Sequence, residues 1–152
     1  TGVTSDYEAQ TAGSDRSQAL LLVGWLAARL GWRVATPLID DGDASSVRLR
    51  RPDGGAVLAT LRPAAPKDDA PDRLAALRLD APRATFSVAR DMVPNCAVAR
   101  AETSGMPALE RRVRLERQSE ADLIGEELRL LGHDQTFAES AAIAAEMLGK
   151  GT

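Results

Sequence analysis

The chain is poor in aromatic residues and has a single cysteine. Aromatic residues make up only 3% of the 152 residues, so the core must be built from Leu, Val, Ile and Ala, and binding by stacking on nucleic-acid bases is not expected. One cysteine, Cys96, excludes an intramolecular disulfide and a zinc site made of several cysteines. Because Cys96 stands in an apolar stretch, we expect it to be a small buried hydrophobe.

Lysine is almost absent, since only Lys67 and Lys150 among the 19 basic residues are not arginine. A GC-rich coding bias is the simplest explanation for that. Residues 119–150 carry seven acids and two bases, whereas residues 32–118 carry fifteen bases and twelve acids. The net charge of −3 argues against nucleic acid as a partner.

Long apolar runs are also missing. The longest uncharged one, Ala19 to Ala28, has ten residues, whereas a membrane span needs about 20. It follows an acidic, polar stretch, which argues against a signal peptide. We therefore expect a cytoplasmic protein that does not enter a membrane. The first residue is Thr1 rather than Met, which indicates a fragment or a processed form.

The known catalytic motifs are absent from the sequence. It has one histidine, His133, and no Gly-x-Ser-x-Gly elbow that would present a serine to it. It also lacks the glycine-rich phosphate-binding motifs. The acidic residues 40–43 read as a solvated hairpin turn rather than a calcium loop. We expect no catalytic residue, no cofactor and no metal; a hydrolase that uses His133 is the enzymatic alternative.

The fold class that we expect is α+β. Residues 1–14 look like a polar tail or linker, and residues 15–150 like one domain. A helix is predicted over Arg16–Leu30, ended by Gly31, and its apolar residues surround it, which is typical of a buried helix. Short strands at hairpin spacing favour an antiparallel sheet. The predicted strands are Trp32–Ile39, Ser46–Arg51, Ala56–Arg62, Arg73–Leu79, Thr85–Arg90, Ala97–Glu102 and Arg111–Leu115.

Two further helices are predicted after the strands. Ser119 is a good cap for a helix over Glu120–Leu131, and Asp134 for a helix to about Leu148. We expect both to pack on the sheet together with the first helix.

Four arginines are candidates for binding a protein partner. Strand alternation places Arg48 and Arg50 on one face of their strand, and Arg112 and Arg114 on one face of theirs. If the two strands are neighbours, one sheet face becomes basic. This face is either solvated and neutralised by nearby acids, or a docking surface for an acidic partner.

Three helical residues complete the candidate set. Trp25 and Arg29 are four residues apart, which allows a cation–π contact, although burial of Trp25 in the core is the simpler expectation. Glu127 falls on the apolar face of its predicted helix and needs a cationic partner, such as Arg29 or Arg111. That partner is either an internal one or a residue of another protein.

Two anchor segments resemble the carboxy-terminal domain of the glucose-6-phosphate dehydrogenase assembly protein family, OpcA. The order and spacing agree from Leu20 to about Ala142, while the strands between the anchors match only in pattern. The matching residues are Trp25-Leu26-Ala27-Ala28-Arg29, Arg111-Arg112-Val113, Ser119, Leu123, Glu126-Glu127-Leu128-Arg129, Leu131 and Asp134.

The resemblance implies a bacterial, non-enzymatic partner of glucose-6-phosphate dehydrogenase. Such a partner assists oligomerisation or activation of the enzyme, as an allosteric activator, in the oxidative pentose phosphate pathway. Members of the family usually carry a further amino-terminal domain, and this chain has only the polar tail there. The alternative is a small α+β domain that associates with itself as a homo-oligomer and has no metabolic enzyme partner.

Overall fold

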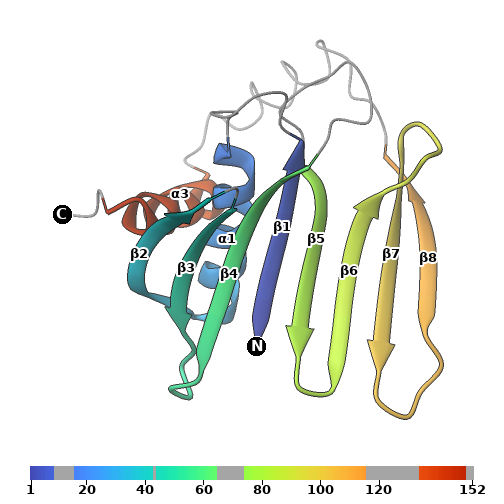
Figure 1. Ribbon diagram of the computed structural model, residues 1–152, viewed down its shortest axis with the longest axis horizontal. Coiled ribbons are helices and arrows are strands. Elements are labelled where there is room, and N and C mark those ends of the chain that lie inside the picture. The colour runs from blue at the N-terminus through green and yellow to red at the C-terminus, as the bar shows by residue number, and fades with distance from the viewer. Residues whose placement is uncertain (9–15, 43, 65–73, 116–133, 150–152) are drawn as a thin grey trace.

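One sheet with two helices on one of its faces makes up the fold (Figure 1). The computed structural model describes residues 1–8, 16–42, 44–64, 74–115 and 134–149. The described residues form eight strands in the spatial order β2-β3-β4-β1-β5-β6-β7-β8. Their bounds are β1 (Gly2–Glu8), β2 (Arg33–Asp41), β3 (Ala44–Arg50), β4 (Ala56–Ala64), β5 (Leu74–Ala81), β6 (Ala84–Arg90), β7 (Cys96–Thr103) and β8 (Leu109–Arg114).

All seven strands predicted from the sequence are present, with ends shifted by one or two residues. The strand that sequence reasoning missed is β1, so the prediction of a polar tail is wrong for Gly2–Glu8. This strand lies between β4 and β5, parallel to β4 and antiparallel to β5. The sheet is therefore mixed, and the prediction of a purely antiparallel sheet is also wrong.

Sequence reasoning missed β1 because pairing with the neighbouring strands, rather than its own sequence, stabilises it. Its sequence has little apolar alternation, but its backbone pairs from Gly2 to Glu8 with β4, and from Gly2 to Tyr7 with β5. Val3, which is 1% exposed, supplies an apolar contact to the core. Strand formation depends strongly on such context and only weakly on intrinsic preference.

Helix α1 (Ser17–Leu30) follows the prediction closely. Gly31 adopts the left-handed conformation with φ of 67°, and its backbone N–H donates to the end of the helix. A residue with a Cβ is strained there, which is why glycine ends the helix. Small and aliphatic residues of α1 are buried, whereas Trp25 is 41% exposed. The helix is therefore buried on one side only.

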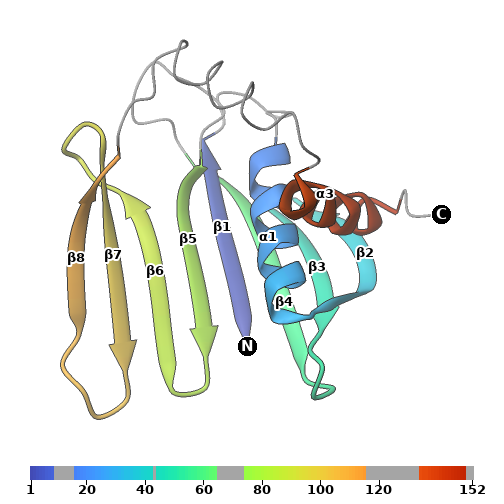
Figure 2. The ribbon, with the colours of Figure 1, turned by 180° about the vertical axis from the view of Figure 1, so that it is seen from behind.

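Helix α3 (Gln135–Met147) begins after Asp134, whose carboxylate accepts a hydrogen bond from the Phe137 backbone N–H at 3.0 Å. This confirms the predicted cap. The helix packs against α1 and β2 (Figure 2), so the prediction that it packs on the sheet is only partly right. The predicted helix over Glu120–Leu131 lies outside the described residues.

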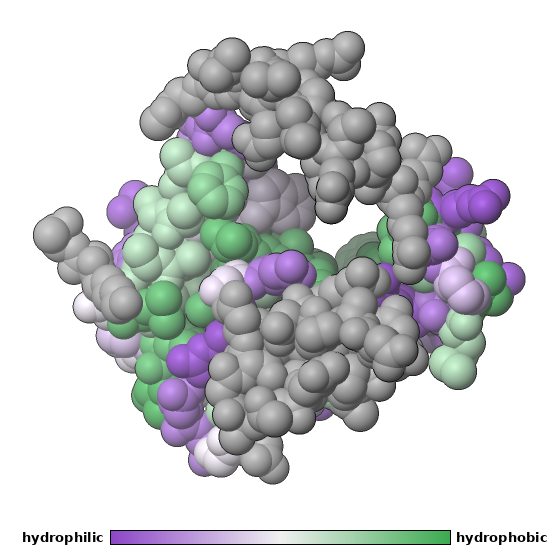
Figure 3. All heavy atoms as spheres, turned by 90° about the horizontal axis from the view of Figure 1, so that it is seen from above, coloured by the Kyte–Doolittle hydropathy of each residue, from purple (hydrophilic) through white to green (hydrophobic). Residues whose placement is uncertain are grey.

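The core lies between α1, α3 and the half of the sheet that contains β1, β3 and β4. Its fully buried side chains are aliphatic with one methionine, namely Leu49, Leu61, Met147, Val3, Val23, Val47 and Val57. Seen from above, hydrophobic surface gathers on the side that carries the helices, whereas hydrophilic and hydrophobic residues mix on the β8 side (Figure 3). Among the described residues, no helix is long and apolar enough to cross a membrane.

Candidate protein interface

Both helices lie on one face of the sheet, so the other face carries no helix in the part of the chain that the structure describes (Figures 1 and 2). We call this other face the open face. Cross-strand partners share a face, so the strand registers identify its members. They include Arg33, Arg48, Arg50, Leu58, Arg78, Asp80, Thr85, Ser87, Arg100, Glu102, Glu110, Arg112 and Arg114.

Arg48 and Arg50 lie on the open face, as strand alternation predicts. Both arginines are exposed. Val47, which precedes Arg48, and Leu49, which lies between the two arginines, face the helices and are each 1% exposed. Burial of the aliphatic residues against α1 thus forces both arginines outward.

Arg112 and Arg114 also lie on the open face, paired with Val98 and Cys96 of β7. However, β8 is the last strand of the sheet and β3 the second, so five strands separate them. The two arginine pairs share a face but do not form one patch. The expectation of neighbouring strands is wrong, because the order of the strands depends on long-range pairing that alternation does not reveal.

Acidic side chains neutralise three arginines on the β5–β8 half of the open face. Arg78 pairs with Asp80 at 2.9 Å, Arg100 with Glu102 at 2.7 Å, and Arg112 with Asp91 at 2.5 Å. The hydrogen bonds from Arg78 and Thr85 hold the pKa of Asp80 below its ordinary value. This half of the face therefore matches the solvated, neutralised alternative.

Asp91 is the least exposed of these carboxylates, with 13% of its side chain exposed. Burial raises its pKa, but the hydrogen bond from Arg112 and those from the backbone N–H groups of Val93 and Met92 outweigh burial, so that the pKa is lowered overall. Arg112 therefore stabilises the turn between β6 and β7, which makes it a structural residue as well as a surface one.

The other half of the open face has arginines without acids. The side chains of Arg33, Arg48 and Arg50 make no ion pair or hydrogen bond within the described ranges, and neither does that of Arg114, which lies on β8 in the β5–β8 half. Arg33 is a residue that sequence reasoning missed. Its position after Trp32 and before Val34 indicated an outward side chain, but its neighbour Arg50 became visible only from the register of β2 and β3.

The helical candidates lie on the opposite side of the molecule from the open face. Trp25 is 41% exposed on α1, so it is not a core residue. Arg29 donates from Nη2 to Thr136 Oγ1 of α3 at 2.8 Å, which makes it an internal link between the helices. Glu127 lies outside the described residues, and so does His133.

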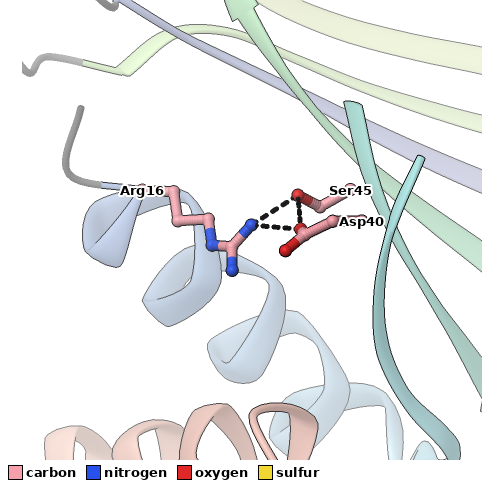
Figure 4. Close-up of polar contacts among 3 residues, drawn as sticks. All are labelled: Arg16, Asp40 and Ser45. Atoms are coloured by element: carbon pink, nitrogen blue, oxygen red, sulfur yellow. Dashed lines mark hydrogen bonds and ion pairs between the residues drawn. The ribbon is translucent and has the colours of Figure 1, made fainter. Parts of the chain in front are cut away.

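A polar cluster joins the start of α1 to the β2–β3 hairpin (Figure 4). Arg16 Nη1 donates to Asp40 Oδ1 and to Ser45 Oγ, each at 2.5 Å, and Ser45 Oγ donates to Asp40 at 2.6 Å. The hydrogen bond from Arg16, followed by that from Ser45, lowers the pKa of Asp40. The expected solvated turn is therefore anchored at Asp40.

This cluster is suited to holding elements together rather than to catalysis. A carboxylate with a lowered pKa is a weak base, and Ser45 is buried, with 5% exposure, and already donates its proton to Asp40. Among the described residues, no group of three or more His, Cys, Asp and Glu side chains could hold a metal ion.

Comparison with protein families identifies a match to nearly the whole chain. The family is described as the carboxy-terminal domain of the glucose-6-phosphate dehydrogenase subunit, and its model matches residues 2–141. A search of curated proteins gives no match to the chain.

Solved structures with a similar fold include several oxidoreductases. KijD10, a 3-ketoreductase from Actinomadura kijaniata solved with NADP, has a TM-score of 0.61 at 9% identity, over 99% of this chain and 51% of that one. UDP-N-acetylglucosamine 3-dehydrogenase GnnA from Acidithiobacillus ferrooxidans has a TM-score of 0.52 at 13% identity, over 97% of this chain and 51% of that one. Aldose-aldose oxidoreductase from Caulobacter crescentus has a TM-score of 0.50 at 15% identity, over 99% of this chain and 54% of that one. The chain spans about half the length of these proteins, and identities this low show a shared fold alone.

Proposed function

Because this chain belongs to the family of glucose-6-phosphate dehydrogenase subunit domains that the match over residues 2–141 identifies, we propose that it is a non-enzymatic domain that binds this dehydrogenase. In this role it assists assembly, oligomerisation or activation of the enzyme in the oxidative pentose phosphate pathway. The observation that carries the proposal is the family match itself, which agrees with the resemblance that the sequence motifs indicate.

The open face supports a role in binding a protein. It extends over the width of the sheet, carries no helix among the described residues, and is rich in arginine. Arginine is enriched in protein interfaces, because its planar guanidinium binds carboxylates with two hydrogen bonds and also covers apolar surface.

The non-enzymatic role rests on the chemistry of the polar residues. The charged side chains of the open face are ion-paired or exposed to solvent, and the Arg16–Asp40–Ser45 cluster is closed by its own hydrogen bonds. The oxidoreductases of similar fold are about twice as long as this chain. We therefore do not transfer their activity to it.

The test is to mix the chain with glucose-6-phosphate dehydrogenase of the same organism. Light scattering should show a complex heavier than either component, and the rate of glucose 6-phosphate oxidation should change, whereas the chain alone should oxidise nothing. An unchanged mass and an unchanged rate, both for this chain and for the longest natural form of the protein, would contradict the proposal.

Self-association is the second candidate function, and one observation favours it. On the helix side of β6 and β8, four apolar side chains are exposed within the described residues: Phe86 (47%), Val88 (46%), Leu109 (72%) and Val113 (42%). Exposed apolar patches often mark interfaces. A mass of the isolated chain that rises with concentration, without any effect of the dehydrogenase, would favour this candidate.

A further inference from the structure

Three arginines meet at the β2–β3 end of the open face. Arg33 and Arg50 are direct cross-strand partners, and Arg48 lies two residues from Arg50 on the same strand and the same face. All three side chains are exposed. We call Arg33, Arg48 and Arg50 the arginine cluster.

The arginine cluster differs in its charge balance from three other arginines of the open face. Arg78, Arg100 and Arg112 each pair with a carboxylate, whereas the three cluster residues make no such contact within the described ranges. Like charges directly opposite each other on neighbouring strands destabilise a sheet. Within the described residues, the fold therefore leaves three neighbouring arginines unneutralised at the β2–β3 end of the open face, whereas Arg114 on β8 is a single residue of this kind.

The cross-strand neighbours of the arginine cluster on β4 are uncharged. The cross-strand partner of Arg50 on β4 is Ala56, and that of Arg48 is Leu58, which is 47% exposed. An exposed leucine next to Arg48 offers an apolar contact at the side of the charged cluster. Arginine is enriched in interfaces, and apolar area beside it adds to the surface that a partner can bury.

We propose that the arginine cluster, with Leu58 beside it, is the site at which an acidic surface of the partner protein docks. This rests on the proposed function, and it names the surface and the chemistry of the contact. Aspartate and glutamate side chains of the partner would accept paired hydrogen bonds from the guanidinium groups. Such a contact speeds association and fixes orientation, and salt weakens it.

The test compares two triple variants with the wild-type chain. One variant replaces the cluster (Arg33→Gln, Arg48→Gln and Arg50→Gln). The control replaces Arg78, Arg83 and Arg100 with glutamine, which removes the same charge from the paired half of the sheet and from the β5–β6 turn. Thermal unfolding verifies that each variant is folded. Surface plasmon resonance then measures association with immobilised glucose-6-phosphate dehydrogenase at several salt concentrations.

At low salt, the cluster variant should associate on the order of tenfold more slowly than the wild type. Its dependence on salt should be shallower, whereas the control should stay within about twofold of the wild type. Equal association of the cluster variant and the wild type would overturn the proposal and leave the proposed function standing. If the wild type itself fails to bind, the proposed function is wrong and this inference falls with it.

Two other occupants would be recognised in the same experiments. Competition by millimolar inorganic phosphate at constant ionic strength would assign the arginine cluster to a phosphate group. A dimer of the chain alone that dissociates in the cluster variant would assign it to a second copy. Either result would overturn the proposal.

Discussion

Gly24 of α1 lies directly against the backbone of α3. A Cβ placed on it would come within 2.4 Å of the Ser140 carbonyl oxygen, a distance that requires one helix to move. Gly24→Ala gains about 1 kcal/mol of helix propensity, but overpacking against a backbone costs about 1–3 kcal/mol. We predict that the variant is less stable than the wild type, by up to about 2 kcal/mol in urea unfolding.

Ala142→Gly is the matched control for Gly24→Ala, because Ala142 is an exposed position of α3. It measures the propensity difference without any change in packing, and it should cost about 1 kcal/mol. If Gly24→Ala proves more stable than the wild type, the two helices are not in the close contact that the structure shows.

For single residues, the sequence predicted the direction of a side chain but not the residues that it contacts. Alternation placed Arg48 and Arg50 outward correctly, since the pleat of a strand is a local property. Their meeting with Arg33, and the pairing of Arg112 with Asp91, depend on how distant segments align. Composition and spacing contain no local signal for such a register.

Strand β1 is the element for which sequence and structure differ most, because the sequence predicts a polar tail there and the structure has a strand. Val3→Asp puts a charge at a position that is 1% exposed. The apolar surroundings there cannot replace the water that solvates a carboxylate. We predict a loss of about 3 kcal/mol or more of unfolding free energy, or failure to fold. Val88→Asp, at a side chain that is 46% exposed on β6, should change stability by less than about 1 kcal/mol. If both substitutions change stability by the same small amount, residues 1–8 do not contribute a strand to the folded sheet.

Elements with strong local signals were predictable, and the one with a weak signal was not. The end of α1 at Gly31 and the cap of α3 at Asp134 follow from backbone chemistry that a few residues determine. The seven hairpin strands follow from their alternation. By contrast, β1 completes a sheet whose neighbouring strands lie far along the chain from it, as in the pairing of Val3 with Ala59.

For the molecule as a whole, motif order in the sequence indicated the partner, whereas the docking surface required the three-dimensional arrangement. The family follows from segments spread over nearly the whole chain. The candidate residues, however, fall on two opposite sides: Trp25 and Arg29 with the helices, and the strand arginines on the open face. Contacts between distant segments separate a neutralised arginine such as Arg112 from an unneutralised one such as Arg48.

Stability of the whole molecule should fall in acid, because lowered-pKa carboxylates anchor distant parts of the sheet. Asp40 joins β2 to α1, Asp80 of β5 accepts a hydrogen bond from Thr85 of β6, and Asp91 contacts Arg112 of β8. The pKa of each is below its ordinary value of 3.8. A lowered pKa means that the unfolded chain binds protons first, so the contribution is complete well above pH 3.8 and is lost as the pH falls through the lower folded values.

We therefore predict that Asp91→Asn is less stable than the wild type at pH 7, and that its unfolding free energy declines less steeply below about pH 4. Urea unfolding at a series of pH values measures both. Asp41→Asn is the control, because it removes an exposed carboxylate at the end of β2 and none of these three anchors. If the two variants show the same acid slope as the wild type, the Arg112–Asp91 pair does not couple protonation to folding. In that case Arg112 would be free to serve the open face as a docking residue rather than as a support for the β6–β7 turn.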